Sequence, residues 1–169
     1  MSLQEKGSNS PLFGIYIHVP FCSTRCDFCA LYEVRPKKGE MELYERSLLK
    51  EIDAADIDRK VDTIFWGGGT PGILPPKMLE RIGGMLCGRL PDPPIEWSVE
   101  MAPSTVKVDR LRSLKDLGVN RISLGVQSFQ ENSLEVLGRK YSKREIYRAV
   151  DLVREIGFEN LNLDLIFGL

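Results

Sequence analysis

Long apolar runs and an excess of one charge are both missing from this sequence. No stretch is long and apolar enough to span a bilayer, and the N-terminus lacks the apolar core of a signal peptide. The 23 Lys and Arg residues nearly balance the 24 Asp and Glu residues, which gives a formal net charge of −1. A balanced charge creates no field that favours nucleic acid or a membrane surface. We therefore expect a cytoplasmic protein with neither kind of partner.

Cysteine, histidine and repeated sequence are also scarce. The 169 residues include four cysteines and one histidine, and they contain no internal repeat or low-complexity tract. The cysteine pattern suits a reducing interior, where thiols persist as metal ligands and not as disulfides. Any imidazole chemistry would fall to His18, for which a packed or backbone-bonded role is equally compatible. The length and a hydrophobic content of 43% fit one globular domain with a core of its own.

Three of the four cysteines lie close together. Cys22, Cys26 and Cys29 follow a short apolar run in the spacing C-x3-C-x2-C. Three thiolates on one tight loop can ligate three irons of a [4Fe–4S] cluster, whereas cluster sites normally use four cysteines. The fourth iron would then be open to an outside ligand, so that a small chelating molecule could bind it and receive an electron.

A zinc site and a redox pair are the alternatives to a cluster at these cysteines. A zinc site would need four ligands, and the remaining candidates are the distant Cys87 and His18. A redox pair of Cys26 and Cys29 would leave Cys22 unexplained. We favour the cluster, because scattered structural cysteines rarely gather this tightly. Cys87 lies on a predicted helix away from the motif, and we interpret it as a buried structural thiol.

Predicted strands and helices alternate along the chain. Strands are expected at residues 13–19, 61–66, 95–100, 121–126 and 161–167. Helices are expected at residues 41–55, 75–90, 134–137 and 142–156. A further helix is expected between a Ser104 cap and Gly118, with an apolar face of Val108, Leu111, Leu114 and Leu117. This alternation predicts an α/β fold, in which right-handed crossovers curl a parallel sheet into a partial (β/α) barrel.

The domain is expected to begin after a polar start. Residues 1–11 are predicted to be a disordered tail, and residues 12–169 to form the N-terminal part of the partial barrel. The sequence stops at the close of the fifth apolar strand, with no helix to cover that strand. An exposed parallel edge is an unusual terminus. We therefore expect the barrel to be truncated after about strand five, with its C-terminal remainder absent.

The cysteine motif, on a loop after the first strand, resembles the radical S-adenosylmethionine (radical SAM) superfamily. Its lead-in, residues 16–21, is similar to the branch of oxygen-independent coproporphyrinogen III dehydrogenases and haem chaperones. Later motifs extend the resemblance to the last residue, namely Gly67-Gly68-Gly69-Thr70-Pro71, residues 120–129, Leu137-Gly138-Arg139 and residues 162–168. The resemblance therefore supports a partial barrel of the radical SAM type.

The resemblance implies two cofactors, a [4Fe–4S] cluster and S-adenosylmethionine. In the family, the positions matched by Gly68 and Glu100 bind the amino-acid part and the ribose hydroxyls of S-adenosylmethionine, and Tyr16 matches a further contact. The cluster ligands would be Cys22, Cys26 and Cys29. A second S-adenosylmethionine would be held at Phe28, Gly69, Thr70, Gln127, Arg139 and Asp164. No residue is assigned as a catalytic acid or base, because the cofactors carry this chemistry.

These assignments have simpler alternatives when the resemblance is set aside. Glu100 at a strand end would then be a solvated charge. Arg139 would be a surface cation near a helix end, and Asp164 a helix N-cap.

The resemblance also implies a role in porphyrin or haem metabolism, with a tetrapyrrole and a low-potential electron donor as partners. The family's dehydrogenases carry a further cysteine where this chain has Leu31, and the haem chaperones tend to have phenylalanine there. The short lead before Tyr16 matches the chaperones better. We therefore favour a haem chaperone slightly over an oxidative decarboxylase. The alternatives are another radical SAM enzyme, such as a methyltransferase or a haem-degrading enzyme, and a zinc-binding α/β domain.

Overall fold

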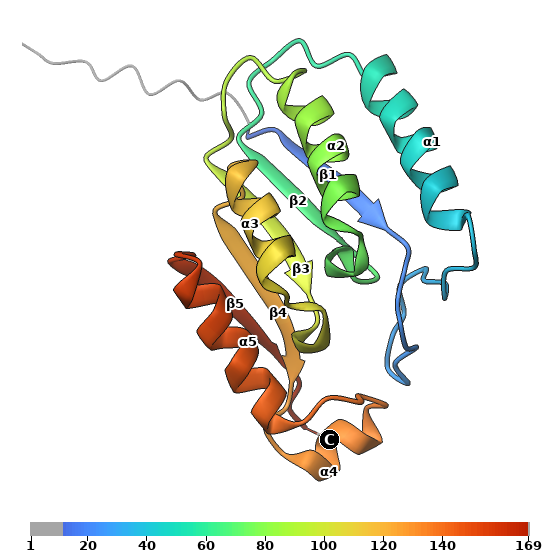
Figure 1. Ribbon diagram of the computed structural model, residues 1–169, viewed down its shortest axis with the longest axis vertical. Helices are drawn as coiled ribbons and strands as arrows, with labels where there is room; N and C mark the ends of the chain where they lie inside the picture. The colour runs from blue at the N-terminus through green and yellow to red at the C-terminus, as the bar shows by residue number, and fades with distance from the viewer. Residues whose placement is uncertain (1–11, 169) are drawn as a thin grey trace, which may run out of the picture.

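The centre of the structure, a computed structural model that describes residues 12–168, is one sheet of five parallel strands (Figure 1). The strands are β1 (Gly14–Val19), β2 (Thr63–Gly68), β3 (Glu96–Met101), β4 (Arg121–Gln127) and β5 (Asn160–Leu165). Their order in the sheet follows the chain, so every connection is a crossover between neighbours. The predicted tail of residues 1–11 lies outside the described residues.

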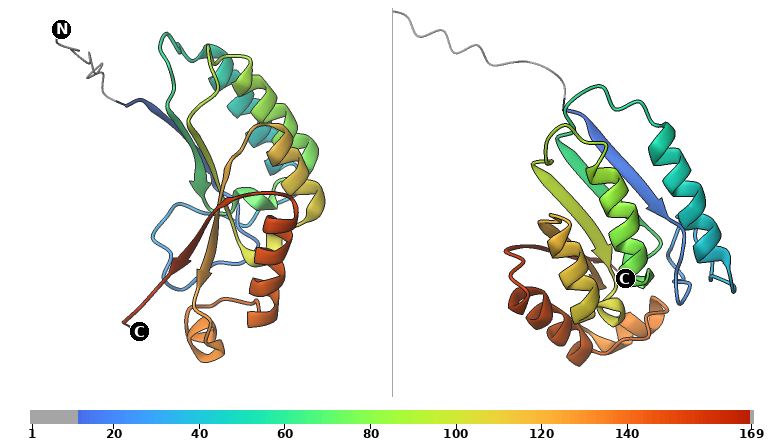
Figure 2. Two further views of the ribbon diagram at one scale, coloured as in Figure 1. Left: turned by 90° about the vertical axis from the view of Figure 1, so that its left-hand side faces the viewer. Right: turned by 45° about the horizontal axis from the view of Figure 1, so that its top comes forward.

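The helices cover one face of this sheet, as the edge-on view in Figure 2 shows. They are α1 (Glu40–Ala54), α2 (Pro76–Cys87), α3 (Val108–Asp116), α4 (Glu131–Val136) and α5 (Lys143–Glu155), with single 3-10 turns at Pro71–Ile73 and Pro103–Thr105. An open parallel sheet with helices on its outer face is the predicted α/β partial barrel, and this prediction is confirmed. No helix within residues 12–168 combines the length and the apolar content that crossing a membrane requires.

Alternate residues of the strands build the core between the sheet and the helices. Trp66 and Trp97 meet edge to face on neighbouring strands, with 5.7 Å between ring centroids. Leu79, Ile82 and Leu86 of α2 are fully buried on the same side. The residues between the core positions point to the opposite face and are largely polar: Glu96, Ser98, Arg121, Ser123 and Asn162 are joined there by hydrogen bonds. The sheet therefore has one apolar face and one polar face.

Two predictions about the covering layer are wrong. Ser104 does not cap a helix, because Pro103 begins a 3-10 turn and α3 starts only at Val108, without a side-chain cap. Thr105 closes that turn instead, since its hydroxyl donates to the carbonyl oxygen of Ala102 at 2.8 Å. Cys87 is exposed and not buried, because it lies in the last turn of α2, where the helix ends at the surface.

Candidate metal and cofactor site

The carboxyl ends of the strands and the loop after β1 enclose a cavity of about 170 Å³. In parallel α/β sheets this edge is where ligands bind. The cavity is lined by all three clustered cysteines, Cys22, Cys26 and Cys29. Every other residue predicted for the site except Tyr16 also lines it, namely Phe28, Gly68, Gly69, Thr70, Glu100, Gln127, Arg139 and Asp164. The fold thus brings together side chains that lie far apart in the sequence.

The loop that carries the cysteines is closed at its base by backbone hydrogen bonds. The Cys22 amide donates to the carbonyl oxygen of Val34 at 3.0 Å, and the Val34 amide donates to that of Pro20 at 2.7 Å. A tight turn lies inside the loop, where the Cys29 amide donates to the carbonyl oxygen of Cys26 at 3.1 Å. The chain therefore leaves β1 and returns to it at one point, which confines the three thiols to the mouth of the cavity.

The three thiols are free, and Cys26 is buried. Burial raises the pKa of Cys22 and Cys26, while the Thr70 hydroxyl acts against this shift at Cys22 and the Arg139 cation acts against it at Cys26. Iron binds the thiolate form, so cluster uptake would release protons here. Within residues 12–168, no three His, Cys, Asp or Glu side chains converge closely enough to hold a single metal ion. A four-iron cluster does not need such convergence, because each thiolate binds a different iron.

The glycine-rich turn after β2 braces the cysteine loop. The Gly69 amide donates to the carbonyl oxygen of Val19, and the Thr70 amide to that of Phe21, both at 2.8 Å. A Cβ atom at Gly69 would lie 2.7 Å from the Phe21 carbonyl oxygen, and Gly68 has a left-handed φ of 103°. The Thr70 hydroxyl lies 3.5 Å from the Cys22 sulfur. Only glycine at position 69 permits this approach of two backbones beside the first cysteine.

Glu100 ends β3 against the same turn. Its Oε2 accepts the Gly68 amide at 3.1 Å, and a carboxylate has acceptor capacity left for further donors. Burial raises the pKa of Glu100, the Gly68 hydrogen bond acts against that shift, and the charge of Asp164 adds to it. Glu100 is therefore not the solvated charge that a strand end alone would suggest.

This raised pKa predicts a pH-dependent difference between the wild type and Glu100→Gln. The folded state holds its proton to higher pH than the unfolded state, so wild-type stability falls as pH rises from the ordinary value of 4.5 through the folded-state pKa. Glutamine keeps an acceptor for the Gly68 amide and does not titrate. Urea unfolding across pH 4 to 8 should therefore show the variant gaining stability relative to the wild type. A difference that is constant across this range would contradict the prediction.

β4 ends in a β-bulge that the sequence did not predict. The pairing with β5 shifts between Gly125 and Gln127, and Gln127 has a φ of 65°, in the left-handed region. The Tyr141 hydroxyl holds the bulge by donating to the carbonyl oxygens of Gly125 at 2.6 Å and Val126 at 3.1 Å. Burial raises the pKa of Tyr141 to about 12, so this donor keeps its proton at neutral pH. The bulge places Gln127 in the wall of the cavity.

Asp164 is held by polar neighbours on the uncovered face of the sheet. The Asn162 amide nitrogen donates to its Oδ1 at 2.7 Å, and the Ser123 hydroxyl lies 3.3 Å from its Oδ2. Asp164 belongs to β5, so it is not a helix N-cap. These contacts fix its carboxylate at the lining of the cavity.

Tyr16 lies outside the cavity wall, and its predicted contact to S-adenosylmethionine stays a prediction. It sits in the middle of β1, where its ring stacks on Phe65 with 6.1 Å between centroids. Its hydroxyl lies 3.1 Å from His18 Nδ1, while His18 Nε2 donates to the carbonyl oxygen of Tyr32 at 2.9 Å. His18 thus has a backbone-bonded role and ties β1 to the cysteine loop.

The family assignment follows from comparison with known proteins. The sequence profile of the Radical SAM superfamily matches residues 16–169. The chain belongs to this superfamily. A solved structure, the radical SAM enzyme coproporphyrinogen III oxidase (HemN) from Escherichia coli, superposes with a TM-score of 0.85 at 31% identity, covering 94% of this chain and 38% of that one.

Curated relatives of this radical SAM chain carry two different names. The heme chaperone HemW of Bacillus subtilis is 36% identical over 161 residues, covering 91% of this chain and 42% of that protein. The oxygen-independent coproporphyrinogen III oxidase of Paracoccus denitrificans is 35% identical over 161 residues, covering 92% of this chain and 36% of that protein. The chain spans about two fifths of the length of such relatives.

Some residues that line this cavity were not among those predicted. Met101 and Ala102 follow β3, Gly125 lies in the bulge, and Leu31 is on the cysteine loop. Position at a strand end could have indicated Met101 and Ala102, since every predicted strand delivers its last residues to this edge. No signal in the sequence indicated the bulge, because it depends on the distant Tyr141.

Proposed function

We propose that this chain forms the part of a radical SAM protein that binds a [4Fe–4S] cluster and S-adenosylmethionine, and that the whole protein acts in porphyrin or haem metabolism as a haem chaperone. One observation carries the proposal: a single cavity is lined by three free cysteines, the glycine-rich turn and Glu100. Membership of the superfamily supports both cofactors in general. The names of the relatives support a tetrapyrrole partner.

The residues of the cavity fit these two cofactors. Cys22, Cys26 and Cys29 would supply the three thiolates, leaving one iron for S-adenosylmethionine. The cluster, when bound, supplies a low-potential electron to that molecule, and the electron itself would come from a separate low-potential donor. The chain's own part is to present ligands on a loop that is closed at Val34 and braced at Gly69.

S-adenosylmethionine would lie between the cluster and the strand ends. Backbone carbonyl oxygens around Gly68 and Gly69 suit its amino group, whereas the amides of Gly68, Gly69 and Thr70 already donate to other groups of the protein. The Glu100 carboxylate suits its ribose hydroxyls. Phe28, Thr70, Gln127, Arg139 and Asp164 line the remainder of the cavity, where we propose a second S-adenosylmethionine.

Glu100→Ala is expected to weaken S-adenosylmethionine binding to the cluster-loaded protein. Losing the acceptor leaves the ribose hydroxyls unpaired in a half-buried site, which costs about 1–3 kcal/mol, or roughly fivefold to 150-fold in affinity. Isothermal titration under anaerobic conditions measures this. Glu96→Ala is the matched control, because Glu96 lies on the same strand and bonds Ser98 and Arg121 away from the cavity. Equal affinities for the wild type and Glu100→Ala would remove Glu100 from the site.

One feature of the cavity favours the chaperone over the decarboxylase. Leu31 is half exposed and lines the cavity at the position where, by resemblance, the dehydrogenases carry a further cysteine. Anaerobic incubation of the full-length protein with coproporphyrinogen III, S-adenosylmethionine and a reductant tests the choice. We expect no turnover in this assay, and binding of haem when haem is titrated into the same protein separately. Catalytic formation of the divinyl product would instead establish the decarboxylase, and stoichiometric zinc without iron would remove the radical SAM function altogether.

A further inference from the structure

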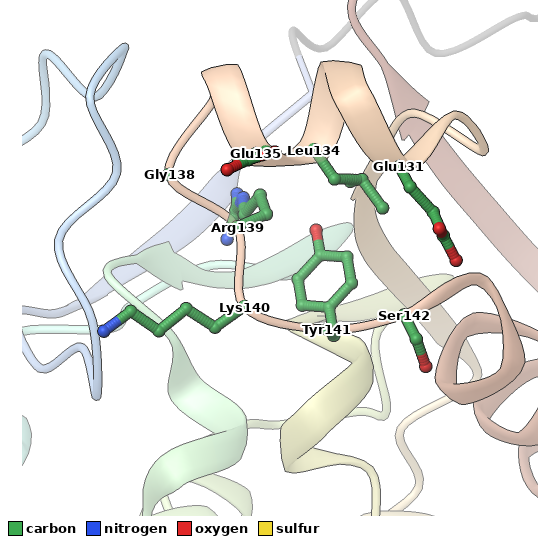
Figure 3. Close-up of a pocket in the computed structure, with 8 residues that line it drawn as sticks. All are labelled: Glu131, Leu134, Glu135, Gly138, Arg139, Lys140, Tyr141 and Ser142. Atoms are coloured by element: carbon green, nitrogen blue, oxygen red, sulfur yellow. The ribbon is translucent and has the colours of Figure 1, made fainter.

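Arg139 is a half-buried cation that has no counter-ion among the residues the structure describes. It follows α4 and lines the cysteine cavity, and it also lines a neighbouring cavity of about 410 Å³ (Figure 3). In Figure 3, Lys140 extends away to one side, while Arg139 stays beside Gly138. Consecutive cations of one turn thus have different environments, one open and one enclosed.

Aromatic rings, and not a carboxylate, hold the Arg139 guanidinium. Its central carbon lies 5.3 Å from the centroid of the Phe28 ring and 5.7 Å from that of Tyr141. Within residues 12–168 no carboxylate forms an ion pair with it, and its Nε is buried without a hydrogen-bond partner. A cation withdrawn from water without an anion is unfavourable, so this site is suited to an anionic occupant nearby.

The same turn contacts the cysteine loop at the two residues between its second and third cysteines. A Cβ atom at Gly138 would lie 2.8 Å from Asp27 Oδ2, so the turn packs directly on Asp27. The next residue, Arg139, covers Phe28. Asp27 and Phe28 are the residues that separate Cys26 from Cys29. The turn therefore touches the loop at the point that sets the spacing of two thiols.

We propose that Arg139 is a positioning residue for the cluster, in addition to any contact with S-adenosylmethionine. It would hold the loop through Phe28 and offset the negative charge of the thiolate-bound cluster. The inference rests on the proposed cluster, which takes up one electron from a low-potential donor with no bond made or broken. That electron adds one negative charge, so a fixed cation nearby favours the reduced state.

Two substitutions separate the charge of Arg139 from its stacking. Arg139→Gln removes the charge, and Arg139→Lys keeps the charge but loses the planar group that covers Phe28. Arg144→Gln is the matched control, since it removes an exposed charge on α5, whereas Lys140 lines a hollow with Ser23 and Glu33 of the cysteine loop. Each full-length variant is reconstituted anaerobically without S-adenosylmethionine. The midpoint potential is measured by redox titration with electron paramagnetic resonance, and iron loss is measured after addition of a chelator.

Arg139→Gln is expected to lower the equilibrium constant for one-electron reduction about tenfold, which corresponds to a potential about 59 mV more negative. Its iron should also be lost faster. Arg139→Lys should keep the wild-type potential and lose iron faster, and Arg144→Gln should match the wild type in both. Phe28→Leu should behave like Arg139→Lys, because it removes the ring and keeps the charge.

An unchanged potential in Arg139→Gln would overturn the electrostatic role, and unchanged iron loss in both Arg139→Lys and Phe28→Leu would overturn the positioning role. Failure of Arg139→Gln to take up iron while its circular dichroism stays native would support the positioning role. A wild-type protein that takes up no cluster would overturn the proposed function itself. Failure of the role proposed for Arg139 and failure of the proposed function therefore give different results.

Discussion

Cys26→Ala is expected to abolish the [4Fe–4S] cluster, while Cys87→Ala should take up iron and sulfide like the wild type. The chain offers only three thiolates at the cavity, and removing one leaves two, too few to retain a cubane cluster. Cys26 is the buried member of the three, so water cannot simply replace its sulfur from bulk solvent. Cys87 is exposed at the end of α2, outside the cavity lining.

The two variants form a matched pair, since each loses one sulfur from a chain with four cysteines. Iron and sulfide analysis after anaerobic reconstitution, with electron paramagnetic resonance after reduction, measures the cluster in each. Circular dichroism on the same samples establishes that both variants are folded. A normal cluster in Cys26→Ala would show that Cys26 is not a ligand. Loss of the cluster in Cys87→Ala would show that the fourth ligand lies on α2.

The order of strands and helices could be predicted because buried parallel strands leave a simple signal. Each strand places alternating apolar residues such as Ile122 and Leu124 in the core, and each helix repeats its apolar face every three to four residues. The edge where ligands gather then follows from topology alone, since all carboxyl ends of parallel strands point the same way. Topology thus explains why Thr70 and Asp164 lie at the same edge, whereas their assignment to one site came from the family resemblance.

Features that depend on distant contacts could not be predicted. The bulge at Gln127 is held by a hydroxyl from Tyr141, and the Arg139 guanidinium is covered by the ring of Phe28 on the cysteine loop. Nothing in the local sequence records such partners. Ser104 illustrates the opposite error: a good capping residue is present, but Pro103 and Thr105 direct the chain into a 3-10 turn first. The preference of Ser104 for a helix N-cap was therefore outweighed by the 3-10 turn that its two neighbours form.

Alanine at two glycines is expected to have opposite effects on stability, because their surroundings differ. Gly69→Ala should destabilise the protein, since its Cβ would lie 2.7 to 3.0 Å from the Phe21 backbone. Backbone atoms cannot move aside as a flexible side chain can, and hydrogen bonds from Gly69 and Thr70 hold the two segments at this spacing. Overpacking of this kind costs about 1–3 kcal/mol and occasionally more. Any backbone shift that relieves this clash would also displace Thr70 and Cys22, so cluster uptake should fall as well.

Gly84→Ala, by contrast, should stabilise the protein. Gly84 lies inside α2 with nothing within 4 Å of an added Cβ, and alanine favours a helix interior by about 1 kcal/mol over glycine. Thermal unfolding should therefore place Gly84→Ala a few degrees above the wild type and Gly69→Ala several degrees below it, since 1 kcal/mol shifts the Tm of a chain of this size by roughly 2–4 °C. Because both changes add the same methyl group, similar melting temperatures for the two variants would mean that the close approach of the glycine turn to Phe21 does not constrain the site.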